Sequence, residues 1–220
     1  MMMMSQTLKR ICIHWTAGGV KANELDRSHY HFTVEQDGDI MAGNLPPESN
    51  IPQNGVSLSG QPEGSYMAHC GGGNSFTIGI SLCGMTGKNP NKTWQNPLLR
   101  SQCETAWQLI AQLCAIYGIP VTAETVYTHY EFGLCNPSTP SAGKIDISVL
   151  PFMPSLLPNQ VGGYIRGRIS AYLVEIKKAG SVKPKTTPAV SKPVATTTPK
   201  APVPAAKPVA NKPASAPVPR

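Results

Sequence analysis

The segment Ile11–Gly18 constrains the fold more than any other part of the sequence. It reads Ile-Cys-Ile-His-Trp-Thr-Ala-Gly, so that an apolar triplet ends in a histidine and small residues follow. Such a triplet is typical of a buried strand, and the small residues let the backbone turn away at its end. We therefore predict a strand over residues 9–14 that holds the His14 imidazole at the mouth of the fold.

Further strand patterns predict a sheet. Residues 29–35 alternate, with Tyr30 on the same face as Phe32 and Val34, and His31 on the opposite face in a structural role. Asp37-Gly38 is a strong hairpin signal and leads into a return strand over residues 39–42. The continuous apolar run Phe76–Leu82 is typical of a central strand that is buried on both faces. A short strand is predicted over residues 126–129.

Helical patterns alternate with these strands. Asn96 is predicted as the N-cap of a helix that starts at Pro97 and stops at Gly118, and a second helix is predicted over residues 160–178. The fold class predicted from this order is α/β, a single domain over residues 1–180 with a mixed central β-sheet flanked by helices. Residues 181–220, rich in Pro, Ala, Lys and Thr, are predicted to be a disordered tail.

The positive charge of the chain lies in this tail. The formal net charge is +7, yet the tail holds seven of the 19 basic residues and none of the 12 acidic ones, so residues 1–180 are neutral. A neutral domain removes the main support for a specific nucleic-acid partner. The basic tail is predicted either to contact an anionic wall or membrane surface, or to act as a solvated spacer.

The cysteines and the first ten residues indicate the cellular compartment in which the protein folds. The six cysteines include no CxxC pair, and Cys12, Cys83, Cys103 and Cys114 lie in apolar runs, which predicts reduced thiols. Residues 1–10 lack the apolar region of a signal peptide. We therefore expect a protein that stays in the cytoplasm of the producing cell. We also expect it to be a monomer.

Two histidines and a carboxylate form a candidate metal site. His14 and His129 each stand at the end of a predicted strand, and Asp146 follows in the segment Gly143-Lys-Ile-Asp. Catalytic zinc takes three protein ligands and keeps one position for water, and this set satisfies that count. Lys144 precedes Asp146 by two residues, so in an extended segment its ammonium lies on the same side and can stabilise an oxyanion.

An ordered set of short motifs resembles a known family. His14-Trp-Thr-Ala-Gly, Tyr30-His-Phe, Ala68-His69, Asn74 before Ile78-Gly-Ile, Thr128-His129 and Lys144-Ile-Asp146 together resemble the type 2 N-acetylmuramoyl-L-alanine amidases, which also include peptidoglycan recognition proteins and phage lysozyme-like amidases. The resemblance covers about residues 11–154. It implies a zinc hydrolase that cuts the amide bond between N-acetylmuramic acid and L-alanine in peptidoglycan. Because residues 1–10 do not resemble a signal peptide, we expect a phage or prophage endolysin that acts in the periplasm or wall after release.

The resemblance also implies roles for single residues. His14, His129 and Asp146 match the zinc ligands, Lys144 matches the transition-state lysine, and Tyr30 matches a catalytic tyrosine. His69 and Asn74 match positions beside the site, where they are predicted to bind substrate or to anchor the loop.

Three alternatives stay open at this point. Ser81 occupies a position where some branches carry a catalytic Glu, so the general base is either Tyr30 or a metal-bound hydroxide. Cys135 is a poorer candidate for the third ligand. A peptidoglycan-binding module without activity and a cytosolic amidase that recycles muropeptides are the alternative functions.

Overall fold

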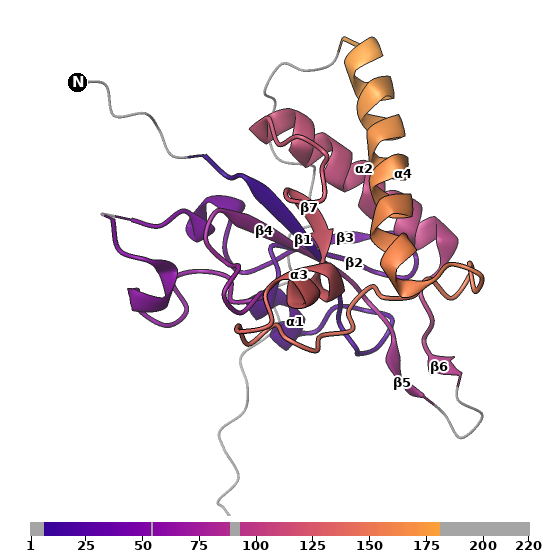
Figure 1. Cartoon of the computed structure of the whole chain (residues 1–220), viewed down its shortest axis with the longest axis horizontal. Helices are drawn as coiled ribbons and strands as arrows, with labels where there is room; N and C mark the ends of the chain where they lie inside the picture. Colours follow the sequence, from indigo (N-terminus) through magenta and orange to yellow (C-terminus); the bar gives the residue numbers. More distant parts are fainter. Residues whose placement is uncertain (1–6, 54, 89–92, 181–220) are drawn as a thin grey trace, which may run out of the picture.

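A five-stranded mixed sheet forms the centre of the fold (Figure 1). The structure is a computed structural model and describes residues 7–53, 55–88 and 93–180. The strands of the sheet are β1 Arg10–Trp15, β2 Phe32–Val34, β3 Ile40–Ala42, β4 Thr77–Leu82 and β7 Val126–Thr128. They lie in the order β3-β2-β4-β1-β7, and β3 pairs antiparallel with β2 while the other pairs are parallel. The predicted α/β fold with a mixed sheet is confirmed, and the predicted tail lies outside the described residues.

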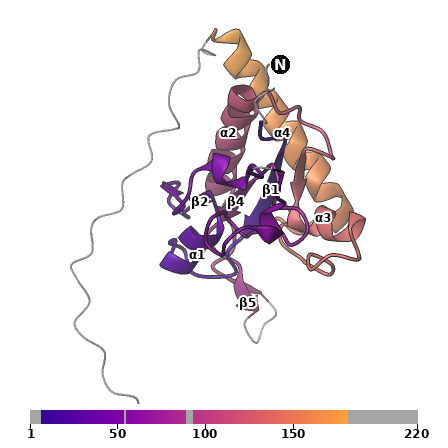
Figure 2. The same ribbon diagram turned by 90° about the vertical axis from the view of Figure 1, so that its left-hand side faces the viewer.

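Two long helices cover one face of this sheet. α2, Arg100–Tyr117, and α4, Pro158–Lys178, lie side by side in both views (Figure 1 and Figure 2) and pack against each other. Within the described ranges, no helix has both the length and the apolar composition of a membrane-spanning segment. The shorter elements are α1 Glu24–His29, α3 His129–Cys135, the 3₁₀ turns η1 Pro47–Asn50 and η2 Leu58–Gly60, and the hairpin of β5 Thr86–Lys88 with β6 Trp94–Gln95.

Alternation along the strands separates an apolar face from a polar one. Ile11 and Ile13 of β1 belong to the main hydrophobic core, together with Trp107 of α2 and Ile165 of α4. Side chains at the intervening strand positions point to the opposite face, because successive residues of a strand alternate. That face, covered by the irregular chain between β3 and β4 and by α3, carries small, polar and thiol residues: Cys12, His14, Thr33, Gly79, Ser81 and Tyr127.

Two asparagines fix the long loop between β3 and β4. The buried Asn50 side chain donates to the carbonyl oxygens of Met67 and Asn74, at 3.0 and 3.1 Å, and accepts from the Met67 N–H at 2.8 Å. Asn74 Oδ1 accepts from the backbone N–H groups of His69 and Cys70, at 3.1 and 2.7 Å. Asn74 therefore anchors the loop, one of the two roles predicted for it, and its bonds set the position of His69.

The outer edge of β7 is protected by an ion pair. Arg166 of α4 donates to the Val126 carbonyl oxygen at 3.1 Å, and Glu131 of α3 accepts from the Thr128 N–H at 2.9 Å. The two side chains also pair with each other at 2.9 and 3.0 Å. Their contact requires glycine at 162, where a Cβ atom would lie 1.9 Å from Glu131 Oε1. The pair occupies backbone groups that would otherwise recruit another strand.

Several predicted element boundaries differ from the structure: α4 begins at Pro158, two residues before its predicted start, and β1 is shifted by one residue. Two further differences have a clear physical cause. The first long helix begins at Arg100 and not at Pro97, because Asn96 has a φ of 47° and its carbonyl oxygen accepts the Met85 N–H. The strand predicted to end at His129 ends one residue earlier. Thr128 caps α3 there, and its hydroxyl accepts from the Glu131 N–H at 3.1 Å. The spacing Thr-x-x-Glu is a capping-box signal that could have predicted α3 from the sequence.

The predicted alternation around Tyr30 is also wrong. β2 begins only at Phe32, and Tyr30 is the C-cap of α1. The Tyr30 ring lies against His14, which is on the polar face, whereas Phe32 and Val34 join the main core on the helical face. The period of a strand does not extend into a helix cap, so Tyr30 is free to reach the polar face.

Candidate metal centre

Three side chains that the sequence predicts as metal ligands converge in the structure. Asp146 Oδ2 lies 3.3 Å from His14 Nδ1 and 3.0 Å from His129 Nδ1. His14 stands near the carboxyl end of β1 and His129 directly follows β7, which is parallel to β1, so both rings reach the same edge of the sheet. Asp146 arrives from the turn after α3, where its carbonyl oxygen accepts the Tyr130 N–H at 3.2 Å.

A chain of hydrogen bonds sets the tautomer of His14. His69 Nε2 lies 3.2 Å from the Thr77 carbonyl oxygen, which can only accept, so this nitrogen donates. Burial, and then the neighbouring His14, lower the pKa of His69 and keep its ring neutral, which leaves His69 Nδ1 without a proton. His14 Nε2 therefore donates to His69 Nδ1 across 3.1 Å. Burial also lowers the pKa of His14 and keeps its ring neutral, so the remaining nitrogen, His14 Nδ1, directs a lone pair at Asp146.

Ser141 sets the tautomer of His129 in the same way. The Ser141 hydroxyl donates its single proton to the Gly71 carbonyl oxygen at 2.8 Å. It must then accept from His129 Nε2, which lies 2.9 Å away. When the ring is neutral, as a metal ligand must be, His129 Nδ1 consequently also directs a lone pair at Asp146. Serine is too common a residue for this role to be read from the sequence, so Ser141 is a functional position that the sequence analysis missed.

This network leaves three acceptor atoms facing one another, which requires a cation between them. Burial raises the pKa of Asp146, but its bonds with His129 and His14 outweigh burial and hold that pKa below its ordinary value, so the carboxylate is ionised. Burial lowers the pKa of His129, but its bonds with Asp146 and Cys70 outweigh burial and raise that pKa to about 9. A proton is thus held here when no metal is bound. Two imidazoles and a carboxylate are ligands that zinc takes in catalytic sites, so the donor set fits zinc.

The site is open on one side. His14 is completely buried and His129 is 3 % exposed, whereas the Asp146 side chain is 17 % exposed. The two histidines are therefore held rigidly beneath, and solvent reaches the cluster past the carboxylate. This arrangement suits a site that keeps a position for water or substrate.

Tyr30 and Ser81 lie next to His14. The Tyr30 ring centroid is 5.1 Å from that of His14. Burial, and then the charge of Asp146, raise the pKa of Tyr30 above its ordinary value, so its hydroxyl stays protonated at neutral pH and acts as a hydrogen-bond donor. Ser81 pairs with His14 in the parallel register of β1 and β4. Position 81, where the resemblance places a catalytic Glu in some branches, therefore lies beside the metal site, but in this chain it carries a hydroxyl.

Lys144 stands on the turn that leads to Asp146. Its backbone N–H donates to the Ser141 carbonyl oxygen at 3.2 Å, and its side chain is exposed. Among the residues that the structure describes, no hydrogen bond or ion pair holds its ammonium group. The turn packs closely on α3, since a Cβ atom at Gly133 would lie 2.2 Å from the Ser141 carbonyl oxygen. The buried Ile147 then anchors the chain in the core.

His31 is buried on the polar face, the same face as Tyr30, and not on the opposite face as predicted. Its Nδ1 accepts from the Gly79 N–H at 2.8 Å, and burial lowers its pKa from 6.5 to about 3. The folded state therefore excludes a proton that the unfolded state binds below pH 6.5. The free energy of unfolding should fall as the pH drops from 6.5 towards 3, by up to about 1.4 kcal/mol per pH unit for this group.

Urea unfolding of the wild type and His31→Asn between pH 7 and 4 tests this expectation. The variant should be less stable at pH 7 because it loses packing and a buried hydrogen bond, and its stability should depend less steeply on pH. Equal slopes in the two proteins would show that His31 does not carry this pH dependence.

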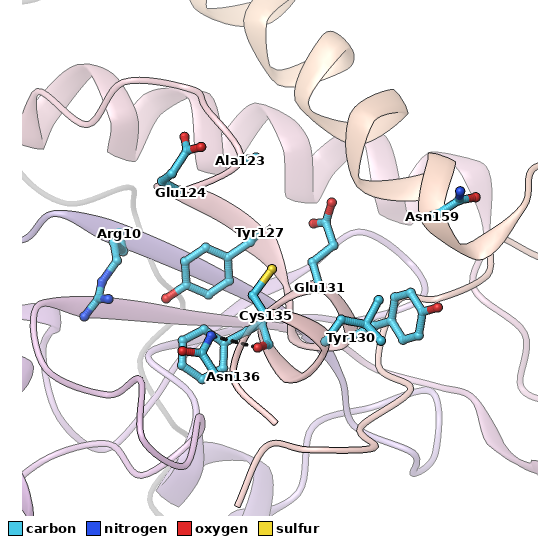
Figure 3. Close-up of a pocket in the computed structure, with 11 residues that line it drawn as sticks. Arg10, Ala123, Glu124, Tyr127, Tyr130, Glu131, Cys135, Asn136 and Asn159 are labelled. Atoms are coloured by element: carbon cyan, nitrogen blue, oxygen red, sulfur yellow. Dashed lines mark hydrogen bonds between the residues drawn. The ribbon is translucent and has the colours of Figure 1, made fainter. Parts of the chain in front are cut away.

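A separate cavity of about 400 Å³ lies along α3, and Figure 3 shows its lining. Cys135, the alternative third ligand, is exposed and lines this cavity, together with Tyr127 and Asn136. Neither His14 nor Asp146 lines it. The structure thus brings Asp146, and not Cys135, to the two histidines.

Comparison with known families decides the class of protein. The model of the family described as N-acetylmuramoyl-L-alanine amidase (Amidase_2) matches residues 4–144. The chain belongs to this family. No individual curated protein matches it at a significant level of similarity. The type 2 amidase resemblance is thereby confirmed, and membership supports peptidoglycan as the substrate of this amidase.

The family match and the geometry cover different parts of the site. The match includes His14, His129 and Lys144 and ends two residues before Asp146. The assignment of Asp146 in this amidase therefore depends on its two contacts with the histidine rings. Ser141 lies within the match, and its hydroxyl is what directs His129 Nδ1 towards Asp146.

Proposed function

We propose that this chain is a zinc-dependent N-acetylmuramoyl-L-alanine amidase, with His14, His129 and Asp146 as zinc ligands. The observation that carries the proposal is the convergence of His14 Nδ1, His129 Nδ1 and Asp146 Oδ2, all as acceptors, at the open edge of the sheet. Zinc, when bound, lowers the pKa of a water ligand and polarises the carbonyl of the scissile amide. The remaining chemistry belongs to the side chains around it.

Lys144 and Tyr30 supply hydrogen bonds and charge. The Lys144 ammonium, exposed and without a competing partner among the described residues, donates to the amide oxygen as that oxygen gains negative charge. The Tyr30 hydroxyl, kept protonated by burial, donates beside His14 and does not act as a base. Asp146 stays ionised throughout and balances the cation.

His69 and Ser141 act on the ligands and not on the substrate. Each fixes the tautomer of one zinc-binding histidine, and such outer partners orient the ligands of metal sites. His69 is 7 % exposed, and its two ring nitrogens are engaged by His14 and by the Thr77 carbonyl oxygen. We therefore propose positioning of His14 as its role in place of the predicted substrate contact.

Gly79 provides a test of this positioning role. A Cβ atom at Gly79 would lie 2.6 Å from the His69 ring, so Gly79→Ala should displace His69 and break its bond with His14. We expect zinc affinity and activity to fall by about 10- to 100-fold, as for other outer-shell changes. Zinc affinity is measured by competition with a chelator. Gly163→Ala is the control, because a Cβ atom there contacts nothing within 4 Å. Unchanged zinc affinity in Gly79→Ala would contradict the positioning role.

Product analysis tests the reaction itself. Purified protein is incubated with peptidoglycan, and the new chain ends are identified by mass spectrometry, with a chelated sample as the control. The proposal predicts free L-alanine amino groups and intact glycan strands. New reducing sugar ends would indicate a glycosidase, and binding without any new ends would indicate the alternative, a peptidoglycan-binding module.

For the biological setting we propose a phage or prophage endolysin that acts on the wall after release. The alternative, a cytosolic amidase that recycles muropeptides, predicts a different preference. An endolysin should release products from intact, cross-linked sacculi, whereas a recycling enzyme should act only on soluble muropeptides. Rates on these two substrates, measured with the same enzyme preparation, distinguish the two settings.

A further inference from the structure

A second group of metal-binding side chains lies directly behind His14. Cys12 and His14 are two residues apart on β1 and therefore project from the same face. Ligand atoms of Cys12, His14 and His69 all lie within 4.8 Å of one another. Cys70, next in sequence to His69, lies with Cys12 in one small buried cluster. The four residues are buried, and the proposed amidase reaction uses neither thiol.

The surroundings of these two thiols differ from those of the other buried cysteines. Cys103 and Cys114 belong to the main hydrophobic core among helix side chains. Cys12 and Cys70 lie instead in a small cluster on the polar face, where Cys70 Sγ is also 3.7 Å from Ser141 Oγ. One thiol and two imidazoles lie within 4.8 Å of one another, and the second thiol belongs to the same cluster as the first. Thiols and imidazoles together are the donors of sulfur–nitrogen metal sites.

We propose that Cys12, Cys70, His69 and His14 form a site for thiophilic metal ions such as Cu(I), and that its occupation excludes zinc from the amidase site. The binding claim stands on these four residues alone. The exclusion claim rests on the proposed function, because it requires His14 to be a zinc ligand. The consequence is an amidase that is inactivated by soft metal ions at a site other than its open edge.

The hydrogen bonds of the two histidines account for the exclusion. His69 Nε2 donates to the Thr77 carbonyl oxygen, so His69 Nδ1 already offers a lone pair to the thiol side. His14 Nε2 lies 3.1 Å from this atom and binds the same ion only if the proton of His14 moves to Nδ1. His14 Nδ1 then donates to Asp146 Oδ2, 3.3 Å away, and no longer offers the lone pair that zinc needs.

The protons and charges of this exchange balance without a redox step. Each thiol that binds the ion releases one proton to solvent, and the oxidation state of the ion does not change. Asp146 passes from zinc ligand to acceptor of the His14 N–H, which is the carboxylate–histidine pair common behind metal-bound imidazoles. Softness favours this set for Cu(I), because thiolates bind soft ions better than the carboxylate of the amidase site does.

Cadmium titration of the zinc-loaded protein tests the proposal. Cd²⁺ is a soft, redox-inert probe, and its thiolate complexes absorb in the ultraviolet, whereas imidazole and carboxylate complexes do not. Every protein carries Cys135→Ser, since Cys135 is exposed and would bind Cd²⁺ by itself. One equivalent of Cd²⁺ should produce the thiolate absorption, release about one equivalent of zinc to a colorimetric chelator, and abolish activity, each with the same dependence on Cd²⁺.

Variants at Cys12 supply the decisive comparison. Cys12→Ala and Cys12→Ser should take up zinc normally, lose most of the absorption, and retain zinc at one equivalent of Cd²⁺. Cys103→Ala, a change in the main core, should respond as the parent does. Thermal unfolding checks the fold of each variant, and if both Cys12 variants unfold, Cys70→Ser is measured in their place with the same expectation.

Three outcomes would overturn the proposal. Equal absorption in the parent and the Cys12 variants would show that these thiols do not bind the ion. Full absorption with zinc retained would show that the two sites do not share His14. Zinc release without thiolate absorption would mean that Cd²⁺ simply displaces zinc at the amidase site. If the parent takes up no zinc, the proposed function fails, whereas the absorption still decides whether the thiol site exists.

Discussion

Replacing His14 or His129 by alanine should remove zinc from the protein and lower amidase activity by at least about a thousandfold, since two remaining ligands hold zinc poorly and the chemistry of the metal is lost with it. Both rings are buried and each donates one hydrogen bond from Nε2, so each change also leaves a partner unsatisfied. The same loss should follow chelation of the wild type, and added zinc should reverse it only in the wild type.

The matched control for these variants is His29→Ala, which removes an exposed histidine of α1. It should retain zinc and full activity. Zinc content is measured by elemental analysis, and activity by the release of L-alanine amino groups from peptidoglycan. Full activity of His14→Ala, or of a metal-free wild type, is incompatible with the proposed function.

Lys144→Ala should lower kcat by about a hundredfold or more while zinc content and thermal stability stay unchanged, because the ammonium is expected to act on the developing oxyanion alone. The side chain is exposed, and among the described residues it makes no contact that folding requires. KM should change much less than kcat. Lys177→Ala, at an exposed position in the last turn of α4, is the control for loss of a lysine charge.

Two results would contradict this role for Lys144. A loss of zinc from Lys144→Ala would mean that the residue supports the turn before Asp146 and that its effect on rate is indirect. An unchanged kcat would remove the lysine from the reaction. Lys144→Arg separates charge from geometry, because arginine keeps the charge and presents it on a planar group of different shape.

The position of His14 could be predicted from the sequence because the alternation of the strand and the apolar character of its neighbours both indicate a buried strand that ends at this residue. The run Ile-Cys-Ile-His is apolar at the positions that face the helices, and the intervening positions face the loop-covered side. The turn at Asp37-Gly38 could also be predicted from the sequence, and Gly38 has a φ of 95°, which glycine adopts readily. Local chemistry decides both features, so they needed no knowledge of distant parts of the chain.

Features that depend on contacts between distant segments could not be predicted in this way. Ser141 acquires its role only because the turn after α3 brings it to His129 and to the Gly71 carbonyl oxygen. Cys70 meets Cys12 only because Asn50 and Asn74 hold the long loop over the sheet. The start of α2 depends on a distant contact in the same way, because the Asn96 carbonyl oxygen accepts the Met85 N–H and the Asn96 backbone therefore cannot cap a helix.

Zinc K-edge X-ray absorption of the wild type loaded with one equivalent of zinc tests the central claim most directly, because it reports the atoms bound to the metal. We expect only nitrogen and oxygen atoms bound to zinc, at about 2.0–2.2 Å, in the wild type, and loss of stoichiometric zinc in Asp146→Ala. A sulfur shell at about 2.3 Å in the wild type would place zinc among the thiols and contradict its assignment to His14, His129 and Asp146.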